Sequence, residues 1–353
     1  MFKRVLSAWF SPGAVDAGKE RVGVAEPPGS VEVAGNRFLV SERMSHSEGL
    51  PHLDWHAVSE WVATLTDEAQ HDHAWRLCER AWLDHLRVAL GPSHELRESE
   101  GTLLLCSLDE RAAKAALDFV NRTERRVLRV LDGIAKVGGW GHDIVVLFDD
   151  EDTYYRYVSH HYPESGEFAF SGGMFINAGC AHFVAVRGEL HALEPTIAHE
   201  TTHALLSHLP LPAWLNEGLA VNTERRLCPV QHDPRYGTST VKMHQRHKVF
   251  WGEQEMQQFW SGQSFLRTDD GNELSYDFAR ILVEQFSADW KRFARFACSA
   301  QLADAGAQAA EQELGIRLGD AVAAILERPS AHGLAPQPDL WTAAPERGAF
   351  VDA

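Results

Sequence analysis

Two histidines and two glutamates lie close together a little past the middle of this 353-residue chain. They are His199, Glu200 and His203 in the stretch HETTH, and Glu217 in the stretch PAWLNEGLA. Residues four apart on a helix lie on one face, so both imidazoles can point at a single metal ion. Glu200 is turned aside from that face, where a carboxylate can act on water instead of binding the metal. Catalytic zinc needs three protein ligands and one open position, and Glu217 is the obvious third ligand.

The segment between His203 and Glu217 must turn the chain back for this to work. It contains Pro210 and Pro212, neither of which can lie inside a helix. We therefore expect the first helix to end before the prolines. A second helix should begin near Ala213 and lean back against the first.

The alternative is a pair of surface histidines beside a solvated glutamate. Chance alone gives HxxxH with a glutamate after the first histidine in roughly one chain in twelve of this composition. That alternative leaves unexplained the apolar residues on either side, at 197–198 and 204–206. It also leaves unexplained the carboxylate in NEGLA on the next predicted helix.

Hydrophobic periodicity predicts the elements that position these residues. Buried strands are expected at 101–108 and 143–150, and a two-stranded element at 168–187 that turns around Asn177-Ala178-Gly179. Helices are expected, in chain order, at 55–65, 73–90, 110–134, 154–162, about 192–208, 213–226, 253–260, 275–288, 289–300, 303–314 and 318–327.

HETTH, a short spacer and then PAWLNEGLA resemble the gluzincin metallopeptidases, and most closely the bacterial peptidase-MA-like family. The order of strands and helices before the motif, and SYDFARILVEQF after it, are similar as well. The resemblance covers about residues 94–328. It implies an α+β fold, in which a zincin-like mixed sheet with the active-site helix precedes a mostly helical C-terminal subdomain.

The resemblance also implies roles for individual residues. His199, His203 and Glu217 would be the zinc ligands, and Glu200 would be the general base in the hydrolysis of peptide bonds. The chain would then be a zinc metallopeptidase of the gluzincin type that acts on a peptide or protein substrate. Zinc would activate water and polarise the substrate carbonyl.

Related gluzincins also supply a Tyr or His from a helix after the third ligand to stabilise the oxyanion. Tyr276, at the start of SYDFARILVEQF, is the first choice for this role. An equally reasonable interpretation is a tyrosine with its ring in the core and its hydroxyl at the surface. Tyr236, His244 and His247 are reserve candidates.

Two other positions bear on the expected site. Thermolysin-like relatives brace a histidine ligand with a carboxylate one turn after the glutamate ligand, but Val221 occupies that place here. No other brace is assigned from the sequence. The stretch 170–176 is expected to border the cleft as an edge strand, with a bend of no substrate role as the alternative.

The pairs His160-His161 and His71/His73 are interpreted as solvated helix-face histidines rather than ligands.

Composition narrows the class of protein further. Lys and Arg number 33 against 50 Asp and Glu, for a formal charge of -17. This balance argues against general binding to nucleic acid or to an anionic membrane. The start of the chain has too short an apolar run for a secretory signal, and no stretch approaches the roughly 20 apolar residues of a membrane span. We therefore expect a cytoplasmic protein, and the sequence leaves its oligomeric state open.

The cysteines agree with this interpretation. There are five, they are widely spread, and no two form a CxxC pair. A disulfide framework and a cysteine-rich zinc site are both unexpected, so buried reduced thiols are predicted. The five residues are Cys78, Cys106, Cys180, Cys228 and Cys298.

Changes in composition divide the chain into four expected parts. These are an irregular N-terminal segment at 1–50, a helical extension at 51–93, the metallopeptidase domain at 94–328 and a flexible tail at 329–353. Two other functions stay open. One is a catalytically inactive zinc-binding interaction module of the same fold, which has no need of a base at Glu200. The other is a binding protein with helical-repeat character at 54–90.

Overall fold

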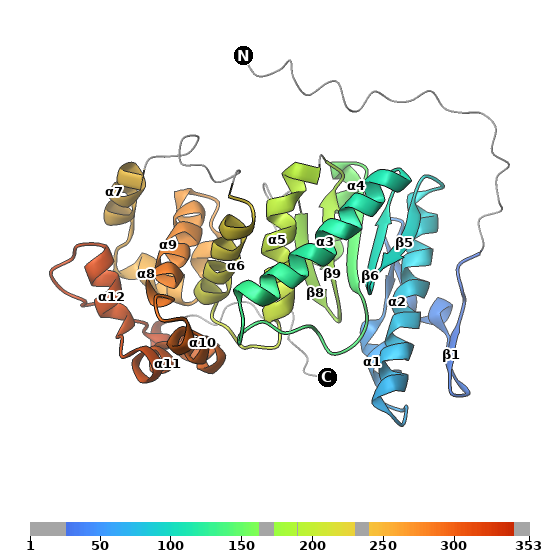
Figure 1. Cartoon of the computed structure of the whole chain (residues 1–353), viewed down its shortest axis with the longest axis horizontal. Helices are drawn as coiled ribbons and strands as arrows, with labels where there is room; N and C mark the ends of the chain where they lie inside the picture. The colour runs from blue at the N-terminus through green and yellow to red at the C-terminus, as the bar shows by residue number, and fades with distance from the viewer. Residues whose placement is uncertain (1–25, 162–172, 189, 230–239, 342–353) are drawn as a thin grey trace, which may run out of the picture.

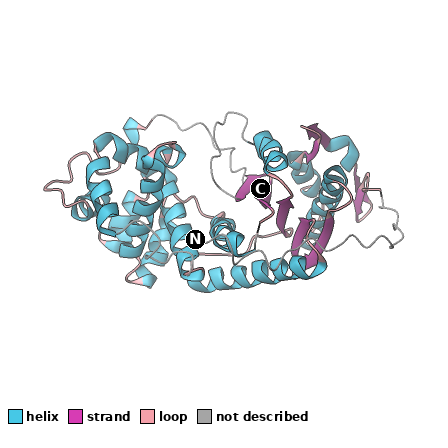
Figure 2. Ribbon diagram, turned by 90° about the horizontal axis from the view of Figure 1, so that it is seen from above, coloured by secondary structure: helices cyan, strands magenta, loops and turns pink. Residues whose placement is uncertain are grey.

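A computed structural model describes residues 26–161, 173–188, 190–229 and 240–341 (Figure 1). The fold is α+β, as the sequence predicts. A mixed sheet and the N-terminal elements occupy one end of the elongated molecule, and the C-terminal helices gather at the other (Figures 1 and 2).

The sheet has five strands in the order β5-β6-β7-β9-β8. The three inner strands are parallel to one another, and each edge strand pairs antiparallel with its neighbour. The predicted strands at 101–108 and 143–150 and the turn at Gly179 are confirmed, whereas β5 was not predicted. The strands are β5 (Glu95–Ser99), β6 (Thr102–Cys106), β7 (Asp143–Phe148), β8 (Gly173–Ala178) and β9 (Cys180–Val186).

One face of the sheet is covered by α1 (Trp55–Val62), α2 (Glu68–Leu90) and α4 (Glu151–His161). Apolar side chains of these helices share a single core with the side chains that β6, β7 and β9 direct to that face. The helical segment at 51–93 is therefore one layer of the body that contains the sheet, and not an appendage to it.

Residues 26–50, expected to be irregular, instead form part of two antiparallel hairpins. These are β1 (Val31–Val33) with β2 (Asn36–Phe38), and β3 (Met44–Ser47) with β4 (Leu50–Leu53). A 3₁₀ turn, η1 (Val40–Arg43), joins them. Each hairpin turns through two residues with positive φ, the second a glycine, which suits a tight turn between twisted strands.

The other face of the sheet is covered by α3 (Glu110–Val130) and α5 (Leu190–Leu206). Both helices also reach the helical end of the molecule. On α5, Ile197 packs in the sheet core, while Ala198 and Leu205 pack in the core of the C-terminal helices. The HETTH helix therefore lies between the two halves, and Figure 1 shows it there.

The C-terminal helices pack around a core rich in Trp and Phe, in which Trp214 and Phe278 are fully buried. The α-helices are α6 (Ala213–Leu227), α7 (Thr240–Phe250), α8 (Glu253–Trp260), α9 (Asp270–Phe286), α10 (Trp290–Ser299), α11 (Ala307–Ala309) and α12 (Leu318–Ile325). Shorter turns are η2 (Gln263–Leu266), η3 (Leu302–Asp304), η4 (Ala310–Leu314) and η5 (Pro338–Leu340). None of the described helices combines the length and apolar character needed to cross a membrane.

The first part of the predicted flexible tail is packed against α8, which corrects the expectation for residues 329–341. Leu334 is buried, and its carbonyl accepts a 2.9 Å hydrogen bond from the indole N–H of Trp260. The side-chain amide of Gln257 donates to the carbonyls of Gly333 and Ala335. The rest of the predicted tail, from 342 on, lies outside the described residues.

Candidate metal centre

The three predicted zinc ligands converge at the contact between α5 and α6. Pro212 is the N-cap of α6, and α6 packs back against α5 as expected. The Nε2 atoms of His199 and His203 each lie 3.3 Å from Oε2 of Glu217. One donor atom from each of the three residues lies within 4.8 Å of the other two. In the part of the chain that the structure describes, no other trio of His, Cys, Asp or Glu meets that condition.

The surroundings of Glu217 fit a bound cation. Its side chain is only 12% exposed, and those of His199 and His203 are 15% and 14% exposed. The Oε2 atom is buried and lacks a hydrogen bond of acceptable geometry. A buried carboxylate oxygen without a partner is costly, and a cation held with the two imidazoles would satisfy it.

The second nitrogen of each histidine is fixed by a neighbour on α6. Nδ1 of His199 lies 3.1 Å from Oε2 of Glu224, and Nδ1 of His203 lies 3.1 Å from Oδ1 of Asn216. Both partner atoms accept hydrogen bonds, so each Nδ1 carries the proton and donates it. The Nε2 lone pairs of both histidines are thereby left to face Glu217, as a metal site requires.

Glu224 and Asn216 were not predicted to orient the histidines. The sequence analysis considered only the position of Val221 for such a partner and assigned none. Glu224 is two turns after Glu217 and so returns to the same face of α6. Asn216 is next to Glu217 in the sequence, with its side chain on His203. A search at seven residues as well as four after the ligand would have found Glu224.

The charges of the site also favour a cation. Burial by itself lowers the pKa of His199, but the neighbouring carboxylates of Glu217 and Glu224 outweigh burial and raise it to about 10. The pKa of His203 is raised in the same sense, against burial, chiefly by the charge of Glu217. Burial raises the pKa of Glu217, but the two histidines reverse this and hold it well below its usual range. Buried carboxylates thus stabilise positive charge at the point where the ligand atoms meet.

Close packing of α6 on α9 fixes the position of Glu217. A Cβ atom at Gly218 would come within 2.6 Å of the carbonyl oxygen of Ala279 and of a methyl group of Val283. The side-chain amide of Asn222 adds hydrogen bonds from α6 to the carbonyls of Gly218 and Arg280. The glycine in NEGLA therefore allows two helix backbones to approach closely.

Glu200 lies outside the ligand group, as predicted, and faces the sheet edge. Its Oε2 accepts a 3.1 Å hydrogen bond from the backbone N–H of Phe175 on β8. Burial raises the pKa of its carboxyl group, while His199 and His203 act in the opposite sense. A raised pKa suits a group that must both take and release a proton.

The strand β8 matches the part of the expected edge strand that is described. Among the described strands it pairs with β9 alone, and residues 170–172 of the predicted stretch lie outside the described residues. Gly173 lies against the ring of Phe183, where a Cβ atom would come within 2.6 Å of it. This contact accounts for that glycine without a substrate.

Tyr276 lies at the site, with its ring centroid 6.4 Å from that of His199. Its ring packs edge-on against Phe265 at 5.2 Å, so it borders both the site and the C-terminal core. This position is compatible both with a role in stabilising the oxyanion and with a ring that packs in the core.

The described reserve candidates are committed to other partners. The imidazole of His247 is buried between Asp277, 2.9 Å from its Nε2, and Trp251, whose indole N–H donates to its Nδ1. His244 contacts Glu327 at 3.1 Å. Tyr236 lies outside the described residues.

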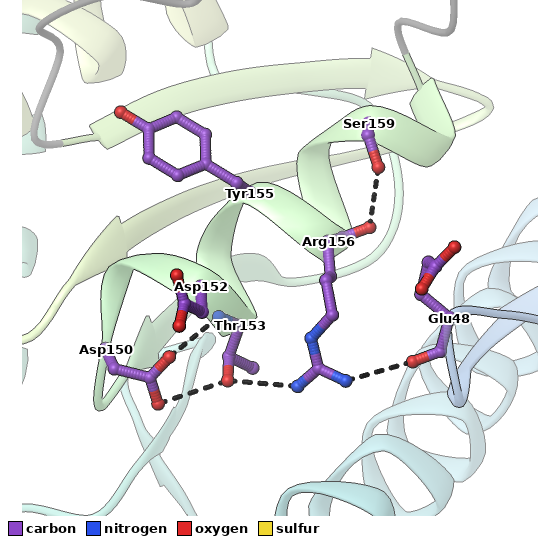
Figure 3. Close-up of a pocket in the computed structure, with 7 residues that line it drawn as sticks. All are labelled: Glu48, Asp150, Asp152, Thr153, Tyr155, Arg156 and Ser159. Carbon is purple, nitrogen blue, oxygen red and sulfur yellow. Dashed lines mark hydrogen bonds between the residues drawn. The ribbon is translucent and has the colours of Figure 1, made fainter.

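A surface hollow of about 840 Å³ lies elsewhere, between α4 and the β3–β4 turn (Figure 3). Within it, the guanidinium of Arg156 donates to the carbonyl of Glu48 and to the hydroxyl of Thr153. None of its lining residues belongs to the candidate metal centre. It therefore has no part in the chemistry considered for that centre.

Comparison with known proteins adds no assignment. A scan against protein-family models and a search of curated proteins both give no match for this chain. The function of the protein is therefore inferred from its residues and their geometry.

Proposed function

We propose that this protein is a zinc metallopeptidase, of the gluzincin type that its motif resembles. The observation that carries the proposal is the convergence of His199, His203 and Glu217, each imidazole presenting Nε2 to a buried carboxylate oxygen that lacks a hydrogen bond. Two imidazoles and one carboxylate are a ligand set typical of catalytic zinc.

His199, His203 and Glu217 would hold the ion, with Glu224 and Asn216 orienting the two imidazoles. When bound, zinc would lower the pKa of water and polarise the substrate carbonyl. Glu200 would take a proton from the attacking water and deliver it to the leaving amine. The hydroxyl of Tyr276 would donate a hydrogen bond to the developing oxyanion.

The backbone of β8 supplies a second element of the proposal. Among the described strands β8 has no partner on its outer side, where an extended peptide could pair, and β8 also carries the amide that holds Glu200. A peptide or protein segment is therefore the proposed substrate class. The five cysteines, none paired with another, fit a reducing compartment, and we propose a cytoplasmic location.

The test is a peptide-library digest that compares the wild type with Glu200→Gln. The substitution is nearly isosteric and keeps an acceptor for the amide of Phe175. Zinc content and melting temperature should therefore be unchanged, while hydrolysis falls by at least about a hundredfold. If the wild type binds zinc but cleaves nothing in the library, the inactive zinc-binding module becomes the better description. Equal cleavage by both proteins would remove Glu200 from the role of base.

A further inference from the structure

A second group of histidines lies on the opposite face of the sheet from α5. His52 of β4, His160 and His161 of α4, and His182 of β9 form what we call the histidine cluster. The rings of His52 and His160 stack with centroids 3.5 Å apart. The centroid of His161 lies 5.4 Å from that of His52 and 5.8 Å from that of His182. The expectation of solvated side chains holds for His160, which is exposed, but only in part for His161, which is half-buried.

Hydrogen bonds of His182 and the burial of its neighbours favour the neutral form of the cluster. Nδ1 of His182 lies 2.8 Å from the carbonyl oxygen of Cys180 and must donate to it. Its Nε2 therefore accepts from the hydroxyl of Tyr157, 2.7 Å away. The Nε2 atoms of His52 and His161 are buried and have no hydrogen-bond partner among the described residues. A proton added to any of these three rings would thus place a buried charge without a counter-charge.

The described elements around the cluster place few negative charges where they could balance a proton on these rings. In the described residues no carboxylate hydrogen-bonds to a cluster imidazole; the nearby buried Glu79 of α2 is instead 2.7 Å from His142. Arg156 of α4, which joins that helix to the β3–β4 turn, adds positive charge. The other titratable groups that face the cluster from the described elements are His46 of β3, Tyr157 of α4, Cys180 of β9 and Cys78 of α2.

The arrangement of the cluster does not suit a metal ion, so protonation is the change that remains for it to respond to. Its donor atoms do not come within 4.8 Å of one another in threes, whereas those of the candidate metal centre do. The residues come from β4, α4 and β9, so the contacts among them join the N-terminal hairpin and the end of α4 to the sheet.

We propose that the histidine cluster is an acid-sensitive latch, which holds the β3–β4 hairpin and the end of α4 on the sheet near neutral pH and releases them in mild acid. The proposal concerns local stability and does not depend on the proposed function. Burial, with the charges of neighbouring histidines, lowers the pKa of His52 to about 3 and that of His161 to about 2. Burial lowers that of His182 to about 4.

The sign of the pH dependence is set by these shifts. An unfolded or released histidine has a pKa near 6.5, so it binds a proton before the packed one does. The stability of the latch is complete above about pH 6.5 and is lost as the pH falls towards the lowered values. Each packed histidine makes opening up to about tenfold more favourable per pH unit in that window.

Hydrogen exchange of the wild-type protein at pH 7.5 and pH 5.5 tests this, after correction for the intrinsic pH dependence of exchange. Residues 44–53 and 151–161 should lose protection at pH 5.5 by about tenfold or more, while α9 and α10 serve as the internal reference. Equal loss of protection in all helices, or none in these two segments, would overturn the latch.

A variant separates the cluster from general acid sensitivity. His161→Phe keeps an aromatic ring but cannot titrate, so opening should lose about a tenfold dependence per pH unit between pH 6.5 and 5. His56→Gln is the control, because His56 is on α1 with its side chain 77% exposed, and should follow the wild type. If His161→Phe fails to fold, His52→Phe carries the same measurement. A wild-type slope in whichever variant folds would contradict the proposal.

Discussion

The candidate metal centre and the histidine cluster both contain histidines, but among the described residues carboxylates surround the first group and not the second. At the metal centre each imidazole faces an acceptor on α6, and the pKa of His199 is raised to about 10. In the cluster the imidazoles face one another, and the pKa of His161 is lowered to about 2. His199 of the first group and His52 of the second are both largely buried, so burial alone does not decide the outcome. The nearby carboxylates do, and they make one group suited to a cation and the other intolerant of charge.

The largest effect is expected from the removal of one proposed zinc ligand. His203→Ala should reduce zinc affinity by roughly a hundredfold to a thousandfold, because an even share of the roughly 10–16 kcal/mol of a four-ligand structural zinc site is about 2.5–4 kcal/mol per ligand. Metal analysis of the purified protein should fall from about one zinc per chain to a small fraction. His244→Ala is the matched control, since His244 pairs with Glu327 and should leave zinc in place. Full zinc occupancy in His203→Ala would refute the metal centre.

Tyr276 tests whether the metal centre performs chemistry as well as binding. Loss of one hydrogen-bond donor to an oxyanion costs about a hundredfold or more in kcat where the donor acts only in the transition state. Tyr276→Phe should therefore lower kcat with little change in KM and with zinc retained. A purely structural tyrosine would instead lower the melting temperature and leave kcat normal, so both are measured on the same protein.

How far the sequence predicts the site can be judged from these residues. The sequence predicted that His199, His203 and Glu217 would lie together with Glu200 beside them, and the structure places them so, because helical spacing and the proline-broken turn fix their relations within one short stretch. The braces were not, and neither was the histidine cluster. Its members come from 52, 160–161 and 182, and only the folded sheet brings them together.

In the fold, too, elements set by local sequence were predicted, whereas those that depend on distant contacts were missed. Strongly periodic helices were predicted closely, and α8 matches its predicted range of 253–260. The α7 helix was missed because its only buried residue is His247, so it has no apolar stripe. The β5 strand was missed because three of its five side chains are charged and none of them is buried, as is common at a sheet edge. Residues 329–341 pack only because Trp260 and Gln257, some 75 residues earlier, bind their backbone.

A smaller effect is expected at the brace of His199. Glu224→Gln keeps a side-chain oxygen to accept from Nδ1 but removes the negative charge. Loss of such a partner typically costs 10- to 100-fold in metal affinity, so about tenfold is expected here. Glu284→Gln, at an exposed carboxylate on α9, is the control and should bind zinc as the wild type does. An unchanged affinity in Glu224→Gln would show that the charge of Glu224 does not act through His199.

The smallest effect is expected at the histidine cluster, where a buried hydrogen bond can be removed. The hydroxyl of Tyr157 donates to Nε2 of His182 and is fully buried, as is the nitrogen that it satisfies. Tyr157→Phe removes the donor and leaves that nitrogen without a partner, which should cost about 1–2 kcal/mol in the free energy of unfolding. Zinc affinity should not change, because the cluster and the metal centre lie on opposite faces of the sheet. Urea unfolding and zinc titration of the same variant measure both quantities. A loss of zinc affinity would mean that the two groups of histidines are coupled through the sheet, and a normal stability would mean that His182 finds another partner.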